Sequence, residues 1–377
     1  MAVFQVELKK VVDDSYSIEI GTNLSGQLAA DVSAGLFGGV KKLAVITDDI
    51  VEGLYAQNIL KGLRQAGFAA ELFVIPAGEK SKTRRMKEQV EDAMIAKGFR
   101  RDCAVVAAGG GVVSDLAGFL AGTYARGVPF AIYATTLLAA ADASIGGKTA
   151  VDTPAATNLI GLFHQPKKVY IDLAAWKTLP ARQIASGLAE TVKHACMADA
   201  AFFTWLEANM PRVLALEPEA CAHIAEVNCQ IKYHVVMQDE REDGMREILN
   251  LGHTVGRAIE TVSDYRLLHG EAVSIGLLAQ AKLSEKRGYM TAEEAGRVEA
   301  LLEAAGLPVA IPDYIDREAL VQKLYTDKKV RDGKLRFVLQ KGIGAVVCHD
   351  TGGPAAKRNY AENISEEQAR AIITAMR

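Results

Sequence analysis

The chain has 377 residues, of which half are apolar and about a quarter are charged. Lys and Arg number 43 against 46 Asp and Glu, so the formal net charge is −3. This near balance excludes a protein held to nucleic acid by bulk charge, although it leaves room for a local basic pocket that binds a small anion. The composition is that of a globular protein with a large core, in one large domain or two ordinary ones.

The cysteines and the apolar runs bear on where the protein works. The five cysteines are scattered, and none forms a CxxC pair: Cys103, Cys196, Cys221, Cys229 and Cys348. We therefore expect neither a disulfide framework nor a thiolate zinc site, and a reducing compartment fits. Residues 1–14 show no signal peptide, and the longest uncharged run, residues 127–141, is shorter than the roughly 20 residues of a membrane span. The expectation is a cytoplasmic protein that binds neither membrane nor nucleic acid.

Short apolar segments alternate with helical ones over the first 178 residues. Residues 3–8 and 16–20 predict two strands around a polar turn. Further strands are expected at residues 42–49, 70–78, 102–111, 130–136 and 168–173, and helices at residues 51–66 and 80–97. This alternation predicts a parallel sheet with helices on its faces.

The pattern changes near Thr178-Leu179-Pro180, and from there to about residue 306 almost no strand signal remains. Amphipathic segments predict helices at residues 181–197, 200–215, 218–238, 254–262, 271–287, 292–305 and 317–326. Residues 334–347 predict a small terminal hairpin. We therefore predict an α/β domain over residues 1–178 and a mostly α-helical domain over residues 179–377, with a site in the cleft between them.

Two glycine-containing segments could hold an anion. Residues 109–115, a glycine triplet that ends in Ser114-Asp115, follow an apolar strand and open a helical segment. Such glycines let backbone N–H groups approach a phosphate at a helix N-terminus. The motif GxGxxG is absent, so a tight strand-to-helix turn explains the segment equally well. Residues 76–82 are just as ambiguous, because a turn with solvated charges has the same composition.

A second motif, Gly146-Gly147-Lys148-Thr149, imitates the end of a P-loop. The spacing fails, because the position where that motif requires its first glycine is Asp142. Lys148 can still act as a point charge for an anion, and an ordinary solvated lysine is the alternative.

Two histidines are predicted at helix starts, in Asn250-Leu251-Gly252-His253-Thr254 and Leu268-His269-Gly270-Glu271. Together with Glu190 on an earlier helix they offer one carboxylate and two imidazoles, a common shell for a catalytic divalent metal. Helix capping or core packing is the alternative for each histidine.

Other residues compete for these roles or extend them. His194 lies four residues after Glu190 and could form a local ligand pair with it instead. The remaining histidines are predicted to be structural or solvated: His164, His223, His234 and His349. Four basic residues stand in apolar or motif-like contexts: Arg126, Lys193, Lys232 and Arg246. Most such residues are solvated charges or ion-pair partners, but near a metal the set favours a doubly anionic substrate.

Taken together, these motifs resemble the 3-dehydroquinate synthase family of the sugar phosphate cyclases. The resemblance runs from about residue 46 to residue 344 and includes several consecutive motifs in order. It is densest in GGGVVSDLAGFLAGTYARG, TTLLAAADASIGGKTAV, NLIGLFHQPKKVYID, LPARQIASGLAETVKH, REILNLGHT and LLHGEAVSIG.

The resemblance implies a fold and an activity. The fold is an N-terminal Rossmann-like α/β domain that binds NAD and a mostly α-helical C-terminal domain that binds metal and substrate, in a homodimer. The implied enzyme is a phosphate-eliminating lyase of the shikimate pathway. It converts 3-deoxy-D-arabino-heptulosonate 7-phosphate to 3-dehydroquinate and phosphate by transient oxidation with NAD, β-elimination, reduction and intramolecular aldol closure. The implied metal is a divalent ion, zinc or alternatively cobalt.

The resemblance also implies roles for individual residues. The metal ligands would be Glu190, His253 and His269. The NAD site would contain Asp48, Glu79, Lys82, Gly110, Gly111, Asp115, Thr135, Thr136 and Thr178. The substrate pocket would contain Asp142, Lys148, Asn158, Lys193, Lys232, Arg246 and Asn250, with Arg126 added to the phosphate site from the same or the partner subunit. Lys328 is a less secure match for a further anion-binding lysine.

Five positions depart from the family pattern. Arg257 stands where the family has a histidine and Thr157 where it has a lysine, while Asp152, Ala143 and His194 replace asparagine, serine and tyrosine. An arginine stays charged and cannot act as a base near neutrality. These departures keep alternatives open. One is a related cyclase acting on sedoheptulose 7-phosphate or an amino analogue, another a metal-dependent polyol dehydrogenase, and a third a non-catalytic homologue that binds NAD or a sugar phosphate.

Overall fold

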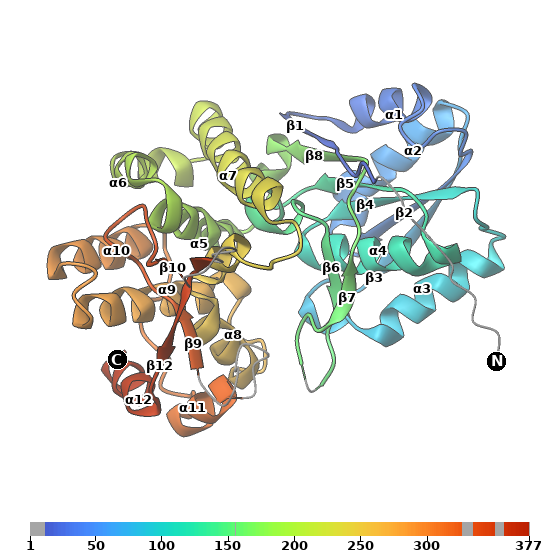
Figure 1. Cartoon of the computed structure of the whole chain (residues 1–377). Coiled ribbons are helices and arrows are strands. Elements are labelled where there is room, and N and C mark those ends of the chain that lie inside the picture. The colour runs from blue at the N-terminus through green and yellow to red at the C-terminus, as the bar shows by residue number, and fades with distance from the viewer. Residues whose placement is uncertain (1–11, 155, 326–334, 351–357, 377) are drawn as a thin grey trace, which may run out of the picture.

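The computed structural model describes residues 12–154, 156–325, 335–350 and 358–376. The chain forms a sheet-containing half, coloured blue to green in Figure 1, and a helical half coloured yellow-green to red. The predicted fold class, a Rossmann-like α/β part followed by a mostly helical part, is confirmed. The strand expected at residues 3–8 and the position of Lys328 lie outside the described residues.

The sheet has six parallel strands in the order β1-β8-β5-β4-β2-β3. Their bounds are β1 Ser17–Gly21, β2 Lys42–Asp48, β3 Ala69–Ile75, β4 Cys103–Gly109, β5 Phe130–Ala134 and β8 Lys168–Asp172. The central strands are apolar along their whole length because both faces of the sheet are covered. After β3 the chain crosses to the other side of β2, so a crevice is expected beyond the carboxyl ends of β2 and β4.

Helices cover both faces of this sheet. One face packs on α1 Ser25–Ser33 and α2 Gln57–Gln65, and the other on α3 Arg84–Ala96 and α4 Gly111–Thr123. Neighbouring residues of β2 show the alternation, since Val45 belongs to the first core and Ile46 to the second. Short π-helical and 3-10 turns, such as Glu52–Ala56 before α2 and Glu79–Ser81 before α3, complete the connections.

A hairpin that the sequence analysis did not predict projects from the sheet toward the helical half. It consists of β6 Lys148–Val151 and β7 Ile160–Phe163, which pair antiparallel with Lys148 opposite Phe163. The segment Gly146-Gly147-Lys148-Thr149 therefore enters a strand rather than a helix. Lys148 lies at the first position of that strand. The strand is near the junction with the helical half (Figure 1).

The helical half is built around α5 Ala181–Ala198 and α9 His269–Lys286, both buried along most of their length. The other helices are α6 Ala200–Leu214, α7 Pro218–Gln238, α8 His253–Val262, α10 Ala292–Ala304, α11 Arg317–Tyr325 and α12 Glu366–Ala375. Polar residues are buried on α5 as well as apolar ones, among them Glu190, Lys193 and His194. Buried charge in the middle of a helix indicates a functional site, because burial of a charge is costly unless it is paired.

The predicted terminal hairpin at residues 334–347 is confirmed at its turn but not along β9. Gln340 and Val346 form an antiparallel bridge, flanked by hydrogen bonds from the N–H of Lys341 to Ala345 and from that of Val347 to Leu339. Strand β9 Leu335–Val338 instead pairs antiparallel with β12 Ala361–Ile364. A further short pair is formed by β10 His349–Asp350 and β11 Arg358–Asn359. The sequence pattern did not identify β12 as the partner of β9, because β12 is short and lies far from β9 along the chain. Within the described ranges, no helix is long and apolar enough to cross a membrane.

Two glycines let α9 approach its neighbours closely. A Cβ atom at Gly270 would lie 1.8 Å from the carbonyl oxygen of Ser186 on α5. A Cβ atom at Gly276 would lie 1.9 Å from the carbonyl oxygen of Gly252, just before α8. The starts of α8 and α9 are thereby held against each other and against α5.

Replacing Gly270 by Ala is expected to push the start of α9 away from α5. We expect a loss of about 1–3 kcal/mol in the free energy of unfolding, because the start of α9 is overpacked against α5. Urea unfolding measures the effect. Gly296→Ala on α10 is the control, since its Cβ would meet no atom within 4 Å. Equal stability of both variants would contradict the close contact between α9 and α5.

Candidate metal and substrate site

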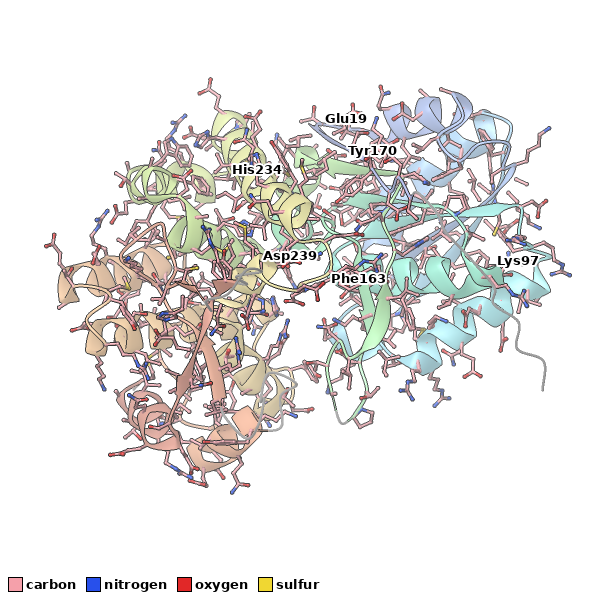
Figure 2. The ribbon with its side chains drawn as sticks, viewed as in Figure 1. Glu19, Lys97, Phe163, Tyr170, His234 and Asp239 are labelled. Carbon is pink, nitrogen blue, oxygen red and sulfur yellow. The ribbon has the colours of Figure 1, made fainter. Side chains whose placement is uncertain are left out.

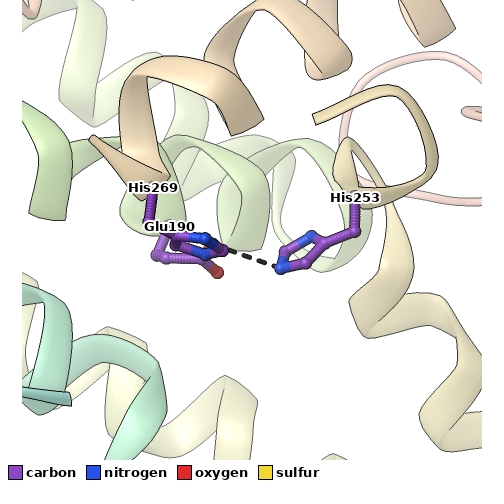
Figure 3. A group of neighbouring side chains, drawn as sticks. All are labelled: Glu190, His253 and His269. Carbon is purple, nitrogen blue, oxygen red and sulfur yellow. Dashed lines mark ion pairs between the residues drawn. The ribbon is translucent and has the colours of Figure 1, made fainter. Parts of the chain in front are cut away.

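Three side chains from three helices converge at the centre of the helical half (Figure 3). His253 is the first residue of α8, His269 is the first residue of α9, and Glu190 lies in the middle of α5. The Nε2 atoms of His253 and His269 lie 3.6 and 3.4 Å from Oε1 of Glu190, which is fully buried. The structure thus brings together the three residues that the sequence predicts as metal ligands.

The other ring nitrogen of each histidine faces an acceptor. Nδ1 of His253 lies 3.1 Å from the carbonyl oxygen of Leu251, and Nδ1 of His269 lies 3.4 Å from Oε2 of Glu260. An acceptor at Nδ1 places the proton there and leaves Nε2 free to bind a metal, as in carboxylate–histidine–metal arrangements. Oε1 of Glu190 is buried and accepts no hydrogen bond from the residues that the structure describes. This set of donor atoms fits a divalent cation.

The local charges show why a cation suits this position. Burial and the neighbouring Lys193 lower the pKa of His253 well below its usual value, so the imidazole is neutral. Burial acts to lower the pKa of His269 as well, but Glu260 and Glu190 outweigh it and raise that pKa to about 10. Burial also acts against ionised Glu190, yet Lys193 and His253 hold its pKa below the usual range. The excess negative charge around His269 is what a bound cation would neutralise.

A second arrangement, with His194 in place of the two other histidines, is less suited to a metal. Asp142, Glu190 and His194 also have potential ligand atoms close together. However, the ammonium groups of Lys193 and Lys232 already contact Asp142. Two ammonium groups beside the ligands oppose a further cation. The geometry therefore favours the set with His253 and His269.

Glu260 was not among the residues predicted from the sequence, although it lies seven residues after His253 and so on the same helical face. Replacing Glu260 by Gln is expected to weaken zinc binding about 10- to 100-fold, because His269 loses its charged partner. Competition with a zinc-binding dye measures the affinity. Glu299→Gln on α10, whose carboxylate pairs with Lys282, is the control. Unchanged zinc affinity in the Glu260 variant would remove it from the metal site.

The residues predicted for the nucleotide follow the carboxyl ends of the parallel strands. Asp48 ends β2 and accepts hydrogen bonds from the backbone of Ile50 and Val51. Gly110 caps α4 after β4, and a Cβ there would approach Thr136, which follows β5, to 3.0 Å. Since the strands are parallel, these positions share one edge of the sheet.

The other members of that group surround the same edge. Thr135 is buried and its hydroxyl has no partner within the described structure, Gly111 begins α4, and Thr178 hydrogen-bonds to Tyr55. A hydroxyl buried without a partner is costly, so Thr135 is suited to meet a ligand.

Glu79, Lys82 and Asp115 form a charged cluster next to this edge. Nζ of Lys82 lies 2.5 Å from Glu79 and 3.4 Å from Asp115, and its side chain is almost completely buried. Burial raises the pKa of Asp115 to about 7, while Lys82 opposes this change. Asp152, one of the departures from the family pattern, stands close by and accepts a hydrogen bond from the backbone of Asn158.

A cavity of about 730 Å³ lies between the β6–β7 hairpin, the end of α7 and the segment before α8. Most of the predicted substrate residues line it, together with Asp115: Asp142, Lys148, Asn158, Lys232, Arg246 and Asn250. Lys193 lies behind Asp142, with its Nζ 3.7 Å from that carboxylate, and contacts Glu190. Asp142 and Lys193 thereby connect the cavity to the metal ligands.

Arg126 does not line this cavity in the single chain. It is exposed in the turn Tyr124–Arg126, with a left-handed backbone at φ 72°. A role for Arg126 in the phosphate site, from this subunit or a partner subunit, stays a prediction.

The polar groups of the cavity already have internal partners. Lys232 contacts Asp142, and Nζ of Lys148 lies 2.5 Å from Oε2 of Glu242. The guanidinium of Arg246 is fully buried and donates to the carbonyl oxygens of Glu240 and Gly146. The carboxylate that the sequence predicts at Arg246 would therefore have to accept from its remaining N–H groups.

Several further cavity residues were not predicted as site residues. They are Glu242, Glu247, Arg336, Arg358 and Asn359, and Arg257, noted above as a departure, also lines the cavity. Arg336 and Asn359 come from β9 and β11, and Arg336 pairs with Glu247. Arg336, Arg358 and Asn359 were missed because the short strands that carry them, β9 and β11, were not predicted with these partners. Glu242 and Glu247 lie between α7 and α8, where the sequence assigned a role only to Arg246 and Asn250.

Fold and site together define a class of protein: an α/β sheet with a nucleotide-type crevice, joined to a helical half that carries a metal-binding cluster beside a basic cavity. A family model described as 3-dehydroquinate synthase N-terminal matches residues 72–186, and one described as 3-dehydroquinate synthase C-terminal matches residues 187–330. The chain belongs to the 3-dehydroquinate synthase family.

Relatives and solved structures agree with this family. A 3-dehydroquinate synthase of Desulforamulus reducens is 44% identical to this chain, and the match covers 92% of this chain and 95% of the relative. A 3-dehydroquinate synthase of Methylococcus capsulatus is 45% identical, and the match covers 91% of this chain and 94% of the relative. Among solved structures, a 2-epi-5-epi-valiolone synthase of Streptomyces hygroscopicus subsp. jinggangensis 5008, with NAD+ and Zn2+ bound, matches 99% of both chains at 28% identity and a TM-score of 0.86. A 2-deoxy-scyllo-inosose synthase shares the fold at 22% identity, with a TM-score of 0.86 over 96% of both chains.

Proposed function

We propose that this chain is a 3-dehydroquinate synthase, a lyase that converts 3-deoxy-D-arabino-heptulosonate 7-phosphate to 3-dehydroquinate and phosphate. The observation that carries the proposal is the connection of Glu190, His253 and His269, through Lys193 and Asp142, to a cavity whose lining includes six basic residues beside five acidic ones. Relatives more than 40% identical over most of the chain carry the same name.

Each cofactor has a set of residues that suits it. Glu190, His253 and His269 would hold a divalent ion, zinc or alternatively cobalt, which when bound would lower the pKa of a substrate hydroxyl. The groups at the carboxyl ends of the strands would hold NAD, which would accept and return a hydride. They are Asp48, Glu79, Lys82, Gly110, Gly111, Asp115, Thr135, Thr136 and Thr178. We assign residues 1–178 to the NAD-binding domain and residues 179–377 to the metal- and substrate-binding domain.

The remaining residues orient the substrate at both ends. A planar guanidinium suits a carboxylate, so Arg246 with Asn250 would bind the carboxylate end. Lys148 and Asn158 would bind the phosphate, Lys148 through its ammonium group and Asn158 through its amide N–H groups. Anchoring a flexible sugar acid at two ends provides the orientation that elimination and ring closure require. Asp142 holds the ammonium group of Lys232 in place between the two ends.

A related cyclase acting on sedoheptulose 7-phosphate or an amino analogue is the second candidate. The 2-epi-5-epi-valiolone synthase has a very similar structure, and Arg257 lines the cavity where the family pattern has histidine. A substrate without a carboxylate would leave Arg246 without its ligand, which argues against this candidate.

Phosphate release separates the two candidates. The protein loaded with zinc and NAD receives 3-deoxy-D-arabino-heptulosonate 7-phosphate in one tube and sedoheptulose 7-phosphate in the other. Release in the first tube only supports the leading proposal, whereas release in the second only assigns the chain to the related cyclases. Release in neither tube would point to a non-catalytic homologue.

We also propose that the protein works as a homodimer in the cytoplasm. All five cysteines are free, and four of them are buried, which suits a reducing compartment. Arg126 is exposed, as a residue that reaches a partner subunit would be. Sedimentation equilibrium at micromolar concentration measures the oligomeric state, and a monomer would contradict the dimer.

A further inference from the structure

Glu242 forms a bridge between two of the residues assigned to substrate binding. Its Oε2 lies 2.5 Å from Nζ of Lys148, and its Oε1 accepts a hydrogen bond of 3.1 Å from Nδ2 of Asn250. Lys148 comes from β6, and Asn250 from the 3-10 turn before α8. One carboxylate of the protein therefore holds a group from each half of the molecule across the cavity.

The backbone aims Glu242 at this position. Glu242 has a left-handed φ of 63°, a conformation that a residue with a side chain rarely adopts unless its surroundings enforce it. Asp239, labelled in Figure 2 at the junction of the two halves, accepts hydrogen bonds from the backbone of Asp243, Gly244 and Arg246. These bonds fix the loop that carries Glu242. The side chain consequently lines the cavity, where it is partly exposed.

We propose that Glu242 is a positioning residue. Its carboxylate pairs with the anion-binding groups before substrate binds, and the substrate phosphate then takes its place at these groups. This inference rests on the proposed function, which assigns Lys148 to the phosphate. An ammonium group has three donors, but a phosphate beside the Glu242 carboxylate would place like charges a few ångströms apart. Phosphate binding therefore requires the carboxylate to withdraw. After elimination, the Glu242 carboxylate would pair with Lys148 again and so favour release of the product phosphate.

Removing the carboxylate is expected to tighten the binding of inorganic phosphate. We expect Glu242→Gln to lower the Kd of the full-length protein for inorganic phosphate about tenfold at pH 6.5, measured by calorimetry, since one competing anion is lost. Glu242→Gly is the second variant, because glycine adopts the left-handed φ without strain. Glu240→Gln is the matched control from the same loop, since its carboxylate accepts a hydrogen bond from Gln165 instead of contacting Lys148.

The pH dependence provides a readout that a merely structural role would not change. The charged groups that face Lys148 are Glu242, Arg246 and Lys232, and only Glu242 among them favours the protonated amine. Phosphate affinity should fall as pH rises through the range in which Lys148 loses its proton. In Glu242→Gln this fall should begin at lower pH than in the wild type, while the ionisation of phosphate itself is common to both.

The outcomes separate this inference from the proposed function. Lys148→Met should weaken phosphate binding, and unchanged binding in that variant would remove the phosphate site from Lys148 altogether. If Lys148→Met weakens binding but both Glu242 variants bind phosphate no better than the wild type, the exchange role of Glu242 is overturned alone. Tighter binding by both Glu242 variants, with Glu240→Gln unchanged, supports it.

Discussion

Replacing Glu190 by Gln is expected to abolish tight zinc binding and to lower kcat/KM about a thousandfold. Glu190 supplies the only carboxylate in the favoured set of ligands, and both imidazoles face its Oε1. A neutral amide keeps the size of the side chain but loses the charge that attracts the cation. Loss of metal catalysis costs several kcal/mol of transition-state stabilisation, and each factor of ten corresponds to about 1.4 kcal/mol.

Metal content and activity measured on the same preparation test this prediction. Glu303→Gln, at an exposed position on α10, is the control that changes the net charge equally. Circular dichroism shows whether the variant folds, since Lys193 loses one of its two acidic neighbours. A Glu190→Gln protein that keeps one zinc per chain and normal turnover would exclude this metal centre.

Replacing Lys148 by Met should lower kcat/KM about a hundredfold, with KM carrying much of the change. A hydrogen bond between charged groups contributes about 1.5–3 kcal/mol, and Lys148 is the cation assigned to the phosphate. Lys61→Met, at an exposed position on α2, is the control. A variant with near-normal kinetic constants would remove Lys148 from the phosphate site.

The pH profile gives the Lys148 variant a second signature. Desolvation lowers the pKa of Lys148 to about 8, although Glu242 opposes the change and the side chain is 43% exposed. The protonated form binds the anion and is present below this pKa, so kcat/KM of the wild type should fall as pH rises through about 8. This fall should be absent from the profile of Lys148→Met. An identical fall in both proteins would assign it to another group.

Much of the fold follows from local sequence patterns. Strands such as β2, β4 and β5 are short apolar runs that end in turn residues, and helices such as α2 and α8 have clear amphipathic spacing. Parallel pairing then places the predicted NAD residues at one edge without further information. The same logic fails for β6 and β7, because a glycine-rich segment that leads into a four-residue strand has the composition of a loop.

The site was predicted where a residue has a recognisable motif around it and missed where its role depends on tertiary contacts. Glycines flank His253 and His269, so their motifs are visible in the sequence. Glu242 stands in a run of charges that resembles a solvated loop, and only its contacts with Lys148 and Asn250 show its place in the cavity. The partners of a buried charge come from distant segments, and spacing along the chain does not reveal them.

The balance of products from one reaction tests the proposed 3-dehydroquinate synthase activity most directly. The zinc- and NAD-loaded protein is supplied with 3-deoxy-D-arabino-heptulosonate 7-phosphate, and phosphate, 3-dehydroquinate and NADH are measured over time. We expect equal amounts of phosphate and 3-dehydroquinate with no net NADH. Accumulation of NADH without phosphate release would contradict it and indicate a polyol dehydrogenase instead.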